Sequence, residues 1–242
     1  MTAFAKCMTR SAVLFGLCAS LIKPALASDS VELTVTTTIR AAACTPTLAG
    51  GGSIDYGPIG ASTLSTTSYT VLPEKQLAFS IVCDAPATVA VVAVNGRPGT
   101  LAGSNDGPGG YGTLPAGVQL FSTNNIRAGG LGLSPSDARI GGYAAIIRPG
   151  TVVADNVSVS SIRTQGGSAT TWISNPTGEL FTAAYATRMK NSWAAAGTTT
   201  PIPFRTLSGT LVVQAYLNKT SELDLSQPIE LKGMSTLELV YL

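Results

Sequence analysis

The sequence predicts an all-β protein built as an antiparallel sandwich or barrel, and three observations support this. Apolar residues recur mostly with period two or in short β-branched runs, as is typical of strands. Gly and Pro account for 26 and 14 of the 242 residues, and they separate these runs. Apolar residues make up 45% of the chain, enough for a sizeable core. Many short strands divided by turns favour a sandwich or barrel.

The first 27 residues have the order of regions found in a secretory leader. Lys6 and Arg10 give a positive start, residues 11–22 form an apolar run, and Ala25 and Ala27 supply a small-x-small pattern. The apolar run is shorter than the about 20 residues that a membrane-spanning helix needs. The sequence therefore predicts an exported protein with a signal peptide at residues 1–27.

Cleavage between Ala27 and Ser28 changes the charge and the cysteine count. The remaining chain has 12 Lys and Arg against 13 Asp and Glu, so its net charge falls from +2 to −1. It keeps Cys44 and Cys83, which in an exported chain without histidine most simply form a disulfide. Two free buried thiols are the alternative. The alternatives to a cleaved leader are an N-terminal core helix and a lipoprotein signal at Cys18.

The predicted strands follow one another along the chain with turn residues between them. Alternation is almost unbroken over residues 31–39, and residues 87–94 have the continuous apolar character of a strand buried on both faces. The other predicted strands are 76–83, 117–122, 143–147, 152–162, 170–173, 209–217 and 236–242. Residues 179–196 are rich in Ala and predict one short helix, with Gly197 as its C-terminal cap.

The most Gly-rich stretch, residues 95–117, predicts a long mobile surface loop. A predicted strand follows it where a phosphate-binding loop would have a helix. Asp106 is its one acid, which is too few oxygen ligands for a calcium loop. A loop of this kind is a natural place for a receptor-facing feature.

Composition argues against catalysis and against nucleic acid as a partner. The chain has no histidine, so Ser-His and Cys-His pairs and the commonest zinc ligand are missing. Neither a Gly-x-Ser-x-Gly elbow nor a clear Ser-x-x-Lys dyad is present. Charged residues make up 12% of the chain, without a basic footprint for nucleic acid. We expect no enzyme activity, no metal and no cofactor.

The two ends of the chain carry the strongest functional signal. Near the N-terminus, alternate residues share one face of a predicted strand: Val31, Leu33, Val35, Thr37 and Ile39. The chain finishes on another predicted strand, in which Leu237, Leu239 and Tyr241 share a face and Leu242 is the last residue.

With these ends, the chain resembles the chaperone–usher fimbrial subunits, or pilins, and more narrowly the pilin-like exported proteins of the β-fimbrial type. The segments that carry the resemblance are Cys44-Thr45-Pro46-Thr47-Leu48, residues 51–57 (GGSIDYG), 200–204 (TPIPF), 209–211 (GTL), 215–219 (AYLNK) and the ending 238–242 (ELVYL). They span nearly all of the chain after the leader.

The resemblance implies an immunoglobulin-like antiparallel sandwich that lacks its last strand. The sandwich would occupy residues 39–242, and residues 28–38 would be an N-terminal extension. Cys44 and Cys83 would link the first two core strands. The gap left by the missing strand would be a groove lined with apolar side chains.

The resemblance also implies a structural subunit of a surface fimbria, exported through the periplasm. A periplasmic chaperone would fill the groove, contacting Leu237, Leu239, Tyr241 and Leu242. At an outer-membrane usher, the alternating face of residues 31–39 from another subunit would then replace the chaperone strand. The alternatives are a single-domain adhesive minor subunit that binds a host or surface receptor, a plain first strand at residues 31–39, and an ordinary core role for Tyr241.

Three features depart from the family pattern. Thr37 stands where the alternating segment usually has Gly. The stretch from Ser28 to Ala43 has only 16 residues, which is short for an extension that also enters the first core strand. Gly233 lies closer to the C-terminus than the family's C-terminal glycine usually does.

Overall fold

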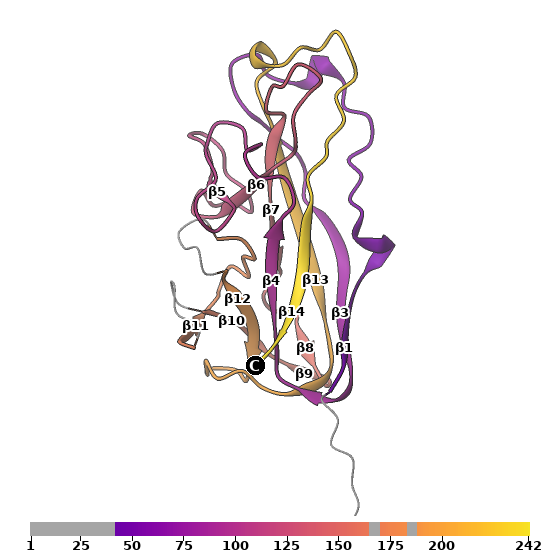
Figure 1. Cartoon of the computed structure of the whole chain (residues 1–242), viewed down its shortest axis with the longest axis vertical. Helices are drawn as coiled ribbons and strands as arrows, with labels where there is room; N and C mark the ends of the chain where they lie inside the picture. The colour runs from indigo at the N-terminus through magenta and orange to yellow at the C-terminus, as the bar shows by residue number, and fades with distance from the viewer. Residues whose placement is uncertain (1–41, 165–169, 183–187) are drawn as a thin grey trace, which may run out of the picture. The chain divides into compact units, whose positions relative to one another are not determined.

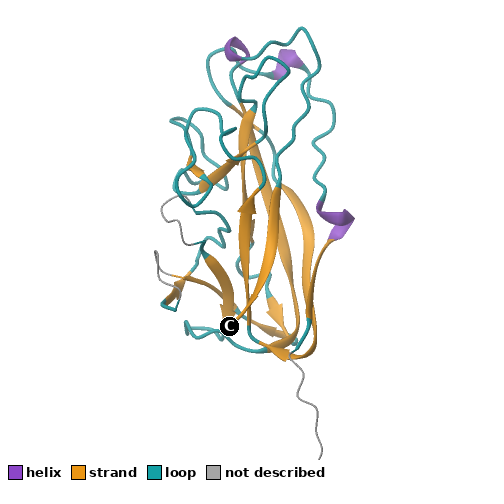
Figure 2. Ribbon diagram, viewed as in Figure 1, coloured by secondary structure: helices purple, strands orange, loops and turns teal. Residues whose placement is uncertain are grey.

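The computed structural model describes residues 42–164, 170–182 and 188–242, all within one compact unit, Ala41–Leu242. The predicted leader, its cleavage site, the extension 28–38 and the strand 31–39 lie outside the described residues. Two antiparallel sheets form a sandwich-like arrangement, which confirms the predicted all-β class (Figures 1 and 2). Within the described ranges, no helix has the length and apolar character needed to cross a membrane.

The first sheet contains the longest strands of the molecule. Its main path runs in the order β1 (Cys44–Leu48), β3 (Lys75–Ala87), β13 (Phe204–Leu217), β7 (Gly141–Ile147), β6 (Arg127–Gly130) and β5 (Gly112–Thr113). Three short strands attach beside this path: β2 (Thr70–Val71), β8 (Val153–Ala154) and β9 (Val157–Ser158). Short 3₁₀ turns follow β1 and β13 and precede β2: η1 (Ala49–Gly52), η3 (Thr220–Glu222) and η2 (Ala61–Thr63).

The second sheet is smaller and ends on the last strand of the chain. Its order is β11 (Trp172–Ser174), β10 (Ser160–Thr164), β12 (Lys190–Ala194), β4 (Val89–Asn95) and β14 (Ser235–Tyr241). In β4, residues 89–93 are buried, as their continuous apolar character predicts. In Figure 1, β14 lies beside β4 and ends at the C-terminus.

The disulfide joins the first two strands of the first sheet. Cys44 on β1 and Cys83 on β3 face each other in the strand register, and their sulfur atoms are bonded. The predicted pairing of these two cysteines is therefore confirmed. It anchors the edge strand β1 to the strand that carries the core residues Phe79 and Ile81.

The main core lies between the two sheets and is centred on aromatic side chains. Trp193 of β12 is 1% exposed and packs near Phe79 of β3 and Phe204 of β13, with ring centroids 6.3 and 5.9 Å away. These residues come from both sheets, so their contact holds the sandwich together. Aromatic pairs in such offset or edge-on arrangements add stability beyond the area that they bury.

A second core covers the outer face of the first sheet. Val212 and Tyr216 of β13 point into it, and Leu101, Leu120 and Ile126 cover them from the 95–128 region. The stretch 95–117 is therefore only in part the surface loop predicted: Leu101, Ala102 and Tyr111 are buried, whereas most of its residues are exposed or half-buried. Its mobility stays a prediction. A strand buried on both faces needs an apolar cover, and Leu101, Ala102 and Leu114 of this stretch contribute to it, while Tyr111 packs in the main core.

The predicted helix at 179–196 is wrong over its described residues. β12 forms at Lys190–Ala194 and pairs with β10 and β4, and Glu179 bridges to Ile146. Residues 183–187 lie outside the described part. Local Ala content favours a helix, but the buried edges of β10 and β4 offer backbone hydrogen bonds that a strand at this position satisfies.

Five predicted strands coincide with observed strands, a sixth overlaps one in part, and the predictions at 117–122 and 152–162 are wrong as single strands. Strands occur at the predicted positions 76–83, 87–94, 143–147, 209–217 and 236–242, and residues 172–174 match the end of the prediction at 170–173. Residues 117–122 form turns, with Phe121 and Ser122 at positive φ. The run 152–162 is broken at Asp155 and Asn156, which also have positive φ and turn the chain between β8 and β9.

The disulfide should supply a large part of the folding stability. Replacing both cysteines (Cys44→Ser and Cys83→Ser) opens a link between residues 39 apart in sequence. The chain-entropy relation gives a loss of about 4 kcal/mol in the free energy of unfolding. Urea denaturation of the oxidised and the double-variant proteins measures it. Thr45→Ser, on the same strand, is the control, and a loss for the double variant no larger than the control's would contradict the expectation.

Candidate functional site

Two neighbouring sheet edges are open in the described structure. β14 pairs with β4 on one side, and β1 pairs with β3 on one side. Neither has a strand partner on its other side among the described residues. A strand edge without a partner exposes backbone N–H and C=O groups that can pair with another chain.

A large apolar groove lies beside these edges, with a volume of about 1030 Å³. Its floor comes from alternate residues of β13 and β7, with contributions from two loops: Leu211, Val213, Ala215, Leu217, Tyr143, Ala145, Leu131, Ile140, Leu180 and Phe181. The opposite faces of β13 and β7 are packed against the second core. The floor of the groove is therefore the inner face of a sheet whose back is fully supported.

One wall of the groove is the chain that follows β1. Residues 53–59 pair with no strand in the described part of the chain. Their side chains alternate between half-buried and exposed through Ile54, Asp55 and Tyr56. Ile54 and Tyr56 line the groove, and the Tyr56 hydroxyl donates to the Val213 carbonyl oxygen over 3.4 Å. This bond ties the wall to the floor. The backbone of the wall itself forms no strand pairing with the described residues.

The opposite wall is β14 together with the segment before it. The alternation of β14 extends back to Ile229, so that one face contains Ile229, Leu231, Gly233, Ser235 and Leu237, all lining the groove. Gly233 is required by space: a Cβ there would lie 2.9 Å from a ring carbon of Tyr143. The glycine thus lets this wall lie directly on the floor.

Hydroxyl groups join this wall to the floor beneath it. The Ser235 hydroxyl shares hydrogen bonds with the hydroxyls of Tyr143 and Tyr111. The Tyr111 ring stacks on Phe181 with centroids 3.9 Å apart. Burial raises the pKa of Tyr143 to about 12, so its hydroxyl is neutral at physiological pH. The apolar floor of the groove therefore meets this wall at a polar cluster whose hydroxyls bond to one another.

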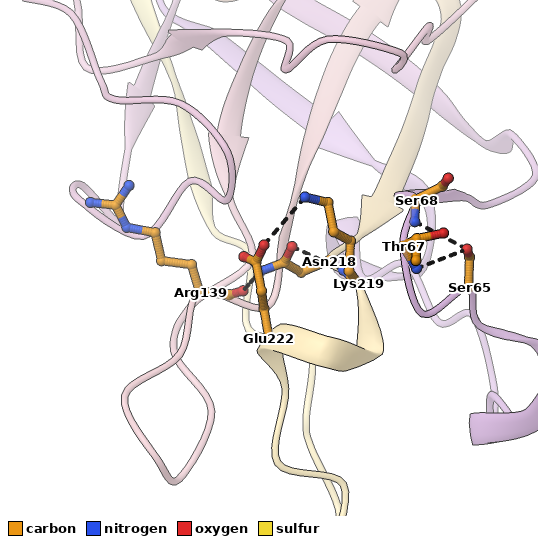
Figure 3. Close-up of polar contacts among 7 residues, drawn as sticks. All are labelled: Ser65, Thr67, Ser68, Arg139, Asn218, Lys219 and Glu222. Carbon is orange, nitrogen blue, oxygen red and sulfur yellow. Dashed lines mark hydrogen bonds and ion pairs between the residues drawn. The ribbon is translucent and has the colours of Figure 1, made fainter.

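Polar contacts join two turns beyond one end of the groove, at residues 218–222 and 65–68. Asn218 is 3% exposed, and its amide donates to the Arg139 carbonyl and to Glu222, which also pairs with Lys219 (Figure 3). The Ser65 hydroxyl accepts from the amides of Thr67 and Ser68 in the facing turn (Figure 3). The Thr220 amide donates to the Ser65 carbonyl over 3.0 Å and joins these two turns.

At the other end the edge strands meet through one side chain. The backbone N–H of Cys44 on β1 donates to the Tyr241 hydroxyl of β14 over 2.7 Å. The groove lining reaches Leu48 on one side and Leu237 on the other and does not include residues 44–47 or 239–241. Beyond each end of the groove, a hydrogen bond thus joins the chain segments that continue from its two walls.

The predicted chaperone-contact strand is β14, but its four residues differ in position. Leu237 lines the groove, and Leu239 is half-buried against the main core. Tyr241 and Leu242 are 51% and 48% exposed, and the Leu242 amide donates to the Thr88 carbonyl. The predicted donor-strand residues Val31, Leu33, Val35, Thr37 and Ile39 lie outside the described residues.

The sequence analysis did not predict the two wall segments that lie outside strands, residues 53–59 and 229–234. The signal was present in each: Ile54 and Tyr56 alternate with polar residues, and Ile229 and Leu231 alternate in phase with β14. Across the described ranges, no cluster of three or more His, Cys, Asp or Glu could hold a metal ion. The candidate functional site is the groove between these two walls.

Comparison with known proteins places the chain in a family. Residues 33–144 match the family described as "Protein of unknown function (DUF1120)". The chain is 31% identical to "Protein GltF" of Escherichia coli (strain K12), over 99% of both chains. It is 30% identical to "Uncharacterized protein YhcF" of the same organism, over 90% of this chain and 93% of the relative.

The chain belongs to this family. No solved structure matches it. The family match begins before the described residues and ends within β7, so it includes β1, β3 and the first groove wall. The similarity to GltF covers 99% of this chain, so it extends over β13, over nearly all of β14 and over the groove between them.

Alkaline pH should destabilise the folded chain through Tyr143. Its folded pKa of about 12 lies above the ordinary value of 10, so its contribution to stability is full below pH 10 and declines as pH rises toward 12. The decline is up to about 1.4 kcal/mol per pH unit. Urea denaturation at pH 8, 10 and 11 should show a steeper loss for the wild type than for Tyr143→Phe. Parallel losses would contradict this assignment.

Proposed function

We propose that this chain is a structural subunit of a surface fimbria that polymerises when an extended segment of one copy fills the groove of the next. The observation that carries the proposal is the open, mostly apolar groove between two extended walls, neither of which has a strand partner on the groove side among the described residues. A strand inserted there would pair with backbone on the walls and bury its inward side chains on the floor. This is β-strand addition between chains.

The N-terminal segment has the chemistry to fill the groove. Burying Val31, Leu33, Val35 and Ile39 would contribute about 1.5–3 kcal/mol each, or about 6–12 kcal/mol in all. Ordering the segment offsets much of this, at about 1–2 kcal/mol per residue. The net affinity then depends on side-chain fit and on backbone hydrogen bonds shielded from water. Such a head-to-tail contact does not close on itself and therefore builds filaments.

The route of assembly follows from the same surface. An unfilled groove would expose an apolar patch beside open edges and invite aggregation. We therefore propose export with the leader at residues 1–27, protection by a periplasmic chaperone that pairs along β14, and transfer at an outer-membrane usher to another copy or a related subunit. This function needs no catalytic residue, metal or cofactor.

The adhesive alternative receives no specific support from the described residues. Its candidate receptor-facing segment, residues 95–117, contributes Leu101 and Tyr111 to buried clusters, with exposures of 1% and 0%. The segment therefore serves as a cover for the first sheet. The structural subunit remains the proposal that accounts for the groove.

Surface fibres should disappear when a charge is placed on the inward face of the extension. Val35→Asp would bring an unpaired carboxylate into an apolar groove, at a cost that prevents insertion. Thr34→Asp, on the opposite face, is the matched control and should leave fibres intact. Electron microscopy of cells producing each variant counts fibres per cell. Fibres from Val35→Asp cells at wild-type number would remove the donor role of this segment.

Accumulation in the periplasm should depend on a cognate chaperone. Without a strand in the groove, the exposed floor favours aggregation and proteolysis, so soluble yield should fall severalfold. Immunoblotting of periplasmic fractions, with and without the chaperone, measures the yield. Equal yields would contradict an incomplete sandwich.

A further inference from the structure

We propose that Tyr241 closes the groove at the carboxyl end of β14, so that the groove seats a short strand with five inward side chains and no more. This inference rests on the proposed function and specifies the partner segment that the groove accepts. It assigns Tyr241 as a positioning residue that sets where the inserted strand stops.

The first observation is the contact that bridges the two edges. The Tyr241 side chain crosses from β14 to β1 and accepts the backbone N–H of Cys44 over 2.7 Å. An inserted strand would have to occupy the space between these same two edges. Because Cys44 is held to β3 by its disulfide, β1 cannot move aside freely at this level.

The second observation concerns the outer edge of β1. The Asp84 amide donates to the Ala43 carbonyl, so by alternation residues 45 and 47 face β3 and residues 44, 46 and 48 face outward. Cys44 gives its outward N–H to Tyr241, and Pro46 has none. At residues 44 and 46, β1 therefore has no free backbone N–H to donate to an incoming strand.

The third observation is the pattern of the opposite wall. The Gly96 amide donates to the Met234 carbonyl and the Leu242 amide to the Thr88 carbonyl, so the even residues of β14 face β4. Its odd residues direct their backbone groups to the open edge. Among the odd residues from 229 to 241, those that line the groove are Ile229, Leu231, Gly233, Ser235 and Leu237, and Leu239 and Tyr241 lie beyond its end.

The extension matches this length. It has five inward positions, Val31, Leu33, Val35, Thr37 and Ile39, and the next one toward the N-terminus is the charged Asp29. The strand pairings within both sheets are antiparallel, and an antiparallel insert would place Val31 beside Leu237 and Ile39 beside Ile229. Val35 then lies beside Gly233, where the wall has no side chain. The short extension thus matches a groove whose lining stops at Leu237, before the end of β14.

The test follows backbone amides during strand insertion. The chain is produced with its own leader and carries Val35→Asp, so that copies do not fill one another. It is mixed with a synthetic peptide of residues 28–41, or with the same peptide carrying Asp29→Val, which adds a sixth apolar position. Residue-resolved hydrogen exchange by NMR is measured at Leu231, Leu237 and Leu239, with and without the further change Tyr241→Phe. Tyr69→Phe, away from the groove, is the control for loss of a hydroxyl.

With Tyr241 present, both peptides should slow exchange at Leu231 and Leu237 about tenfold or more, as about 1.4 kcal/mol of added local stability would. Exchange at Leu239 should not change. In Tyr241→Phe, the Asp29→Val peptide should also slow exchange at Leu239, and Tyr69→Phe should behave like the background chain. Near-UV circular dichroism without peptide confirms that each variant is folded.

Two results would overturn this inference and leave the proposed function intact. One is slowing at Leu239 in the background chain, which would show that the groove continues past Leu237. The other is slowing that still stops at Leu237 in Tyr241→Phe, which would show that the hydroxyl does not set the end. Unchanged exchange at all three amides with either peptide would contradict strand insertion itself and so remove the proposed function.

Discussion

A strand at the edge of a sheet leaves half of its backbone groups without a partner, and β14 is in this position along the core of the molecule. Most edge strands are protected by charge, proline or a covering segment. On β1, fewer outward N–H groups are free, because Pro46 has none and the N–H of Cys44 donates to the Tyr241 hydroxyl. On β14 and the segment before it, the open edge borders an apolar groove instead. Every functional feature proposed for this chain follows from that difference between the two edges.

The groove can remain open because the sheet beneath it is held from behind. β13 has Leu211, Ala215 and Leu217 on the groove side and Val212 and Tyr216 on the other, and both faces contact apolar clusters. The Tyr216 hydroxyl donates to the Ala102 carbonyl over 2.7 Å and fixes the covering loop. In the proposed assembly, a floor supported in this way would keep its shape when a strand enters or leaves, so little energy would be lost to rearrangement on binding.

Three tyrosines link neighbouring strands and segments around the groove through their hydroxyl groups, which an aliphatic side chain could not do. Tyr143 reaches Ser235, Tyr56 reaches the Val213 carbonyl, and Tyr241 reaches the Cys44 amide. Each ring covers apolar surface while its hydroxyl makes a bond across two elements. The walls are therefore positioned by specific hydrogen bonds, and the apolar lining between them stays available to a partner.

The sequence alone determined the all-β class and the positions of the long strands β3, β4, β7, β13 and β14, because alternation is a property of neighbouring residues. It also determined the pairing of Cys44 with Cys83, because these are the two cysteines that follow the predicted leader. The β12 strand and the buried positions within residues 95–117 were decided by tertiary contacts. β12 fills a place between two other strands, and Leu101 and Tyr111 find apolar partners far away in sequence. The groove belongs to the same category. Its walls come from residues 53–59 and 229–237, and only the folded chain brings these segments to opposite sides of one sheet, since no local signal records which edges meet.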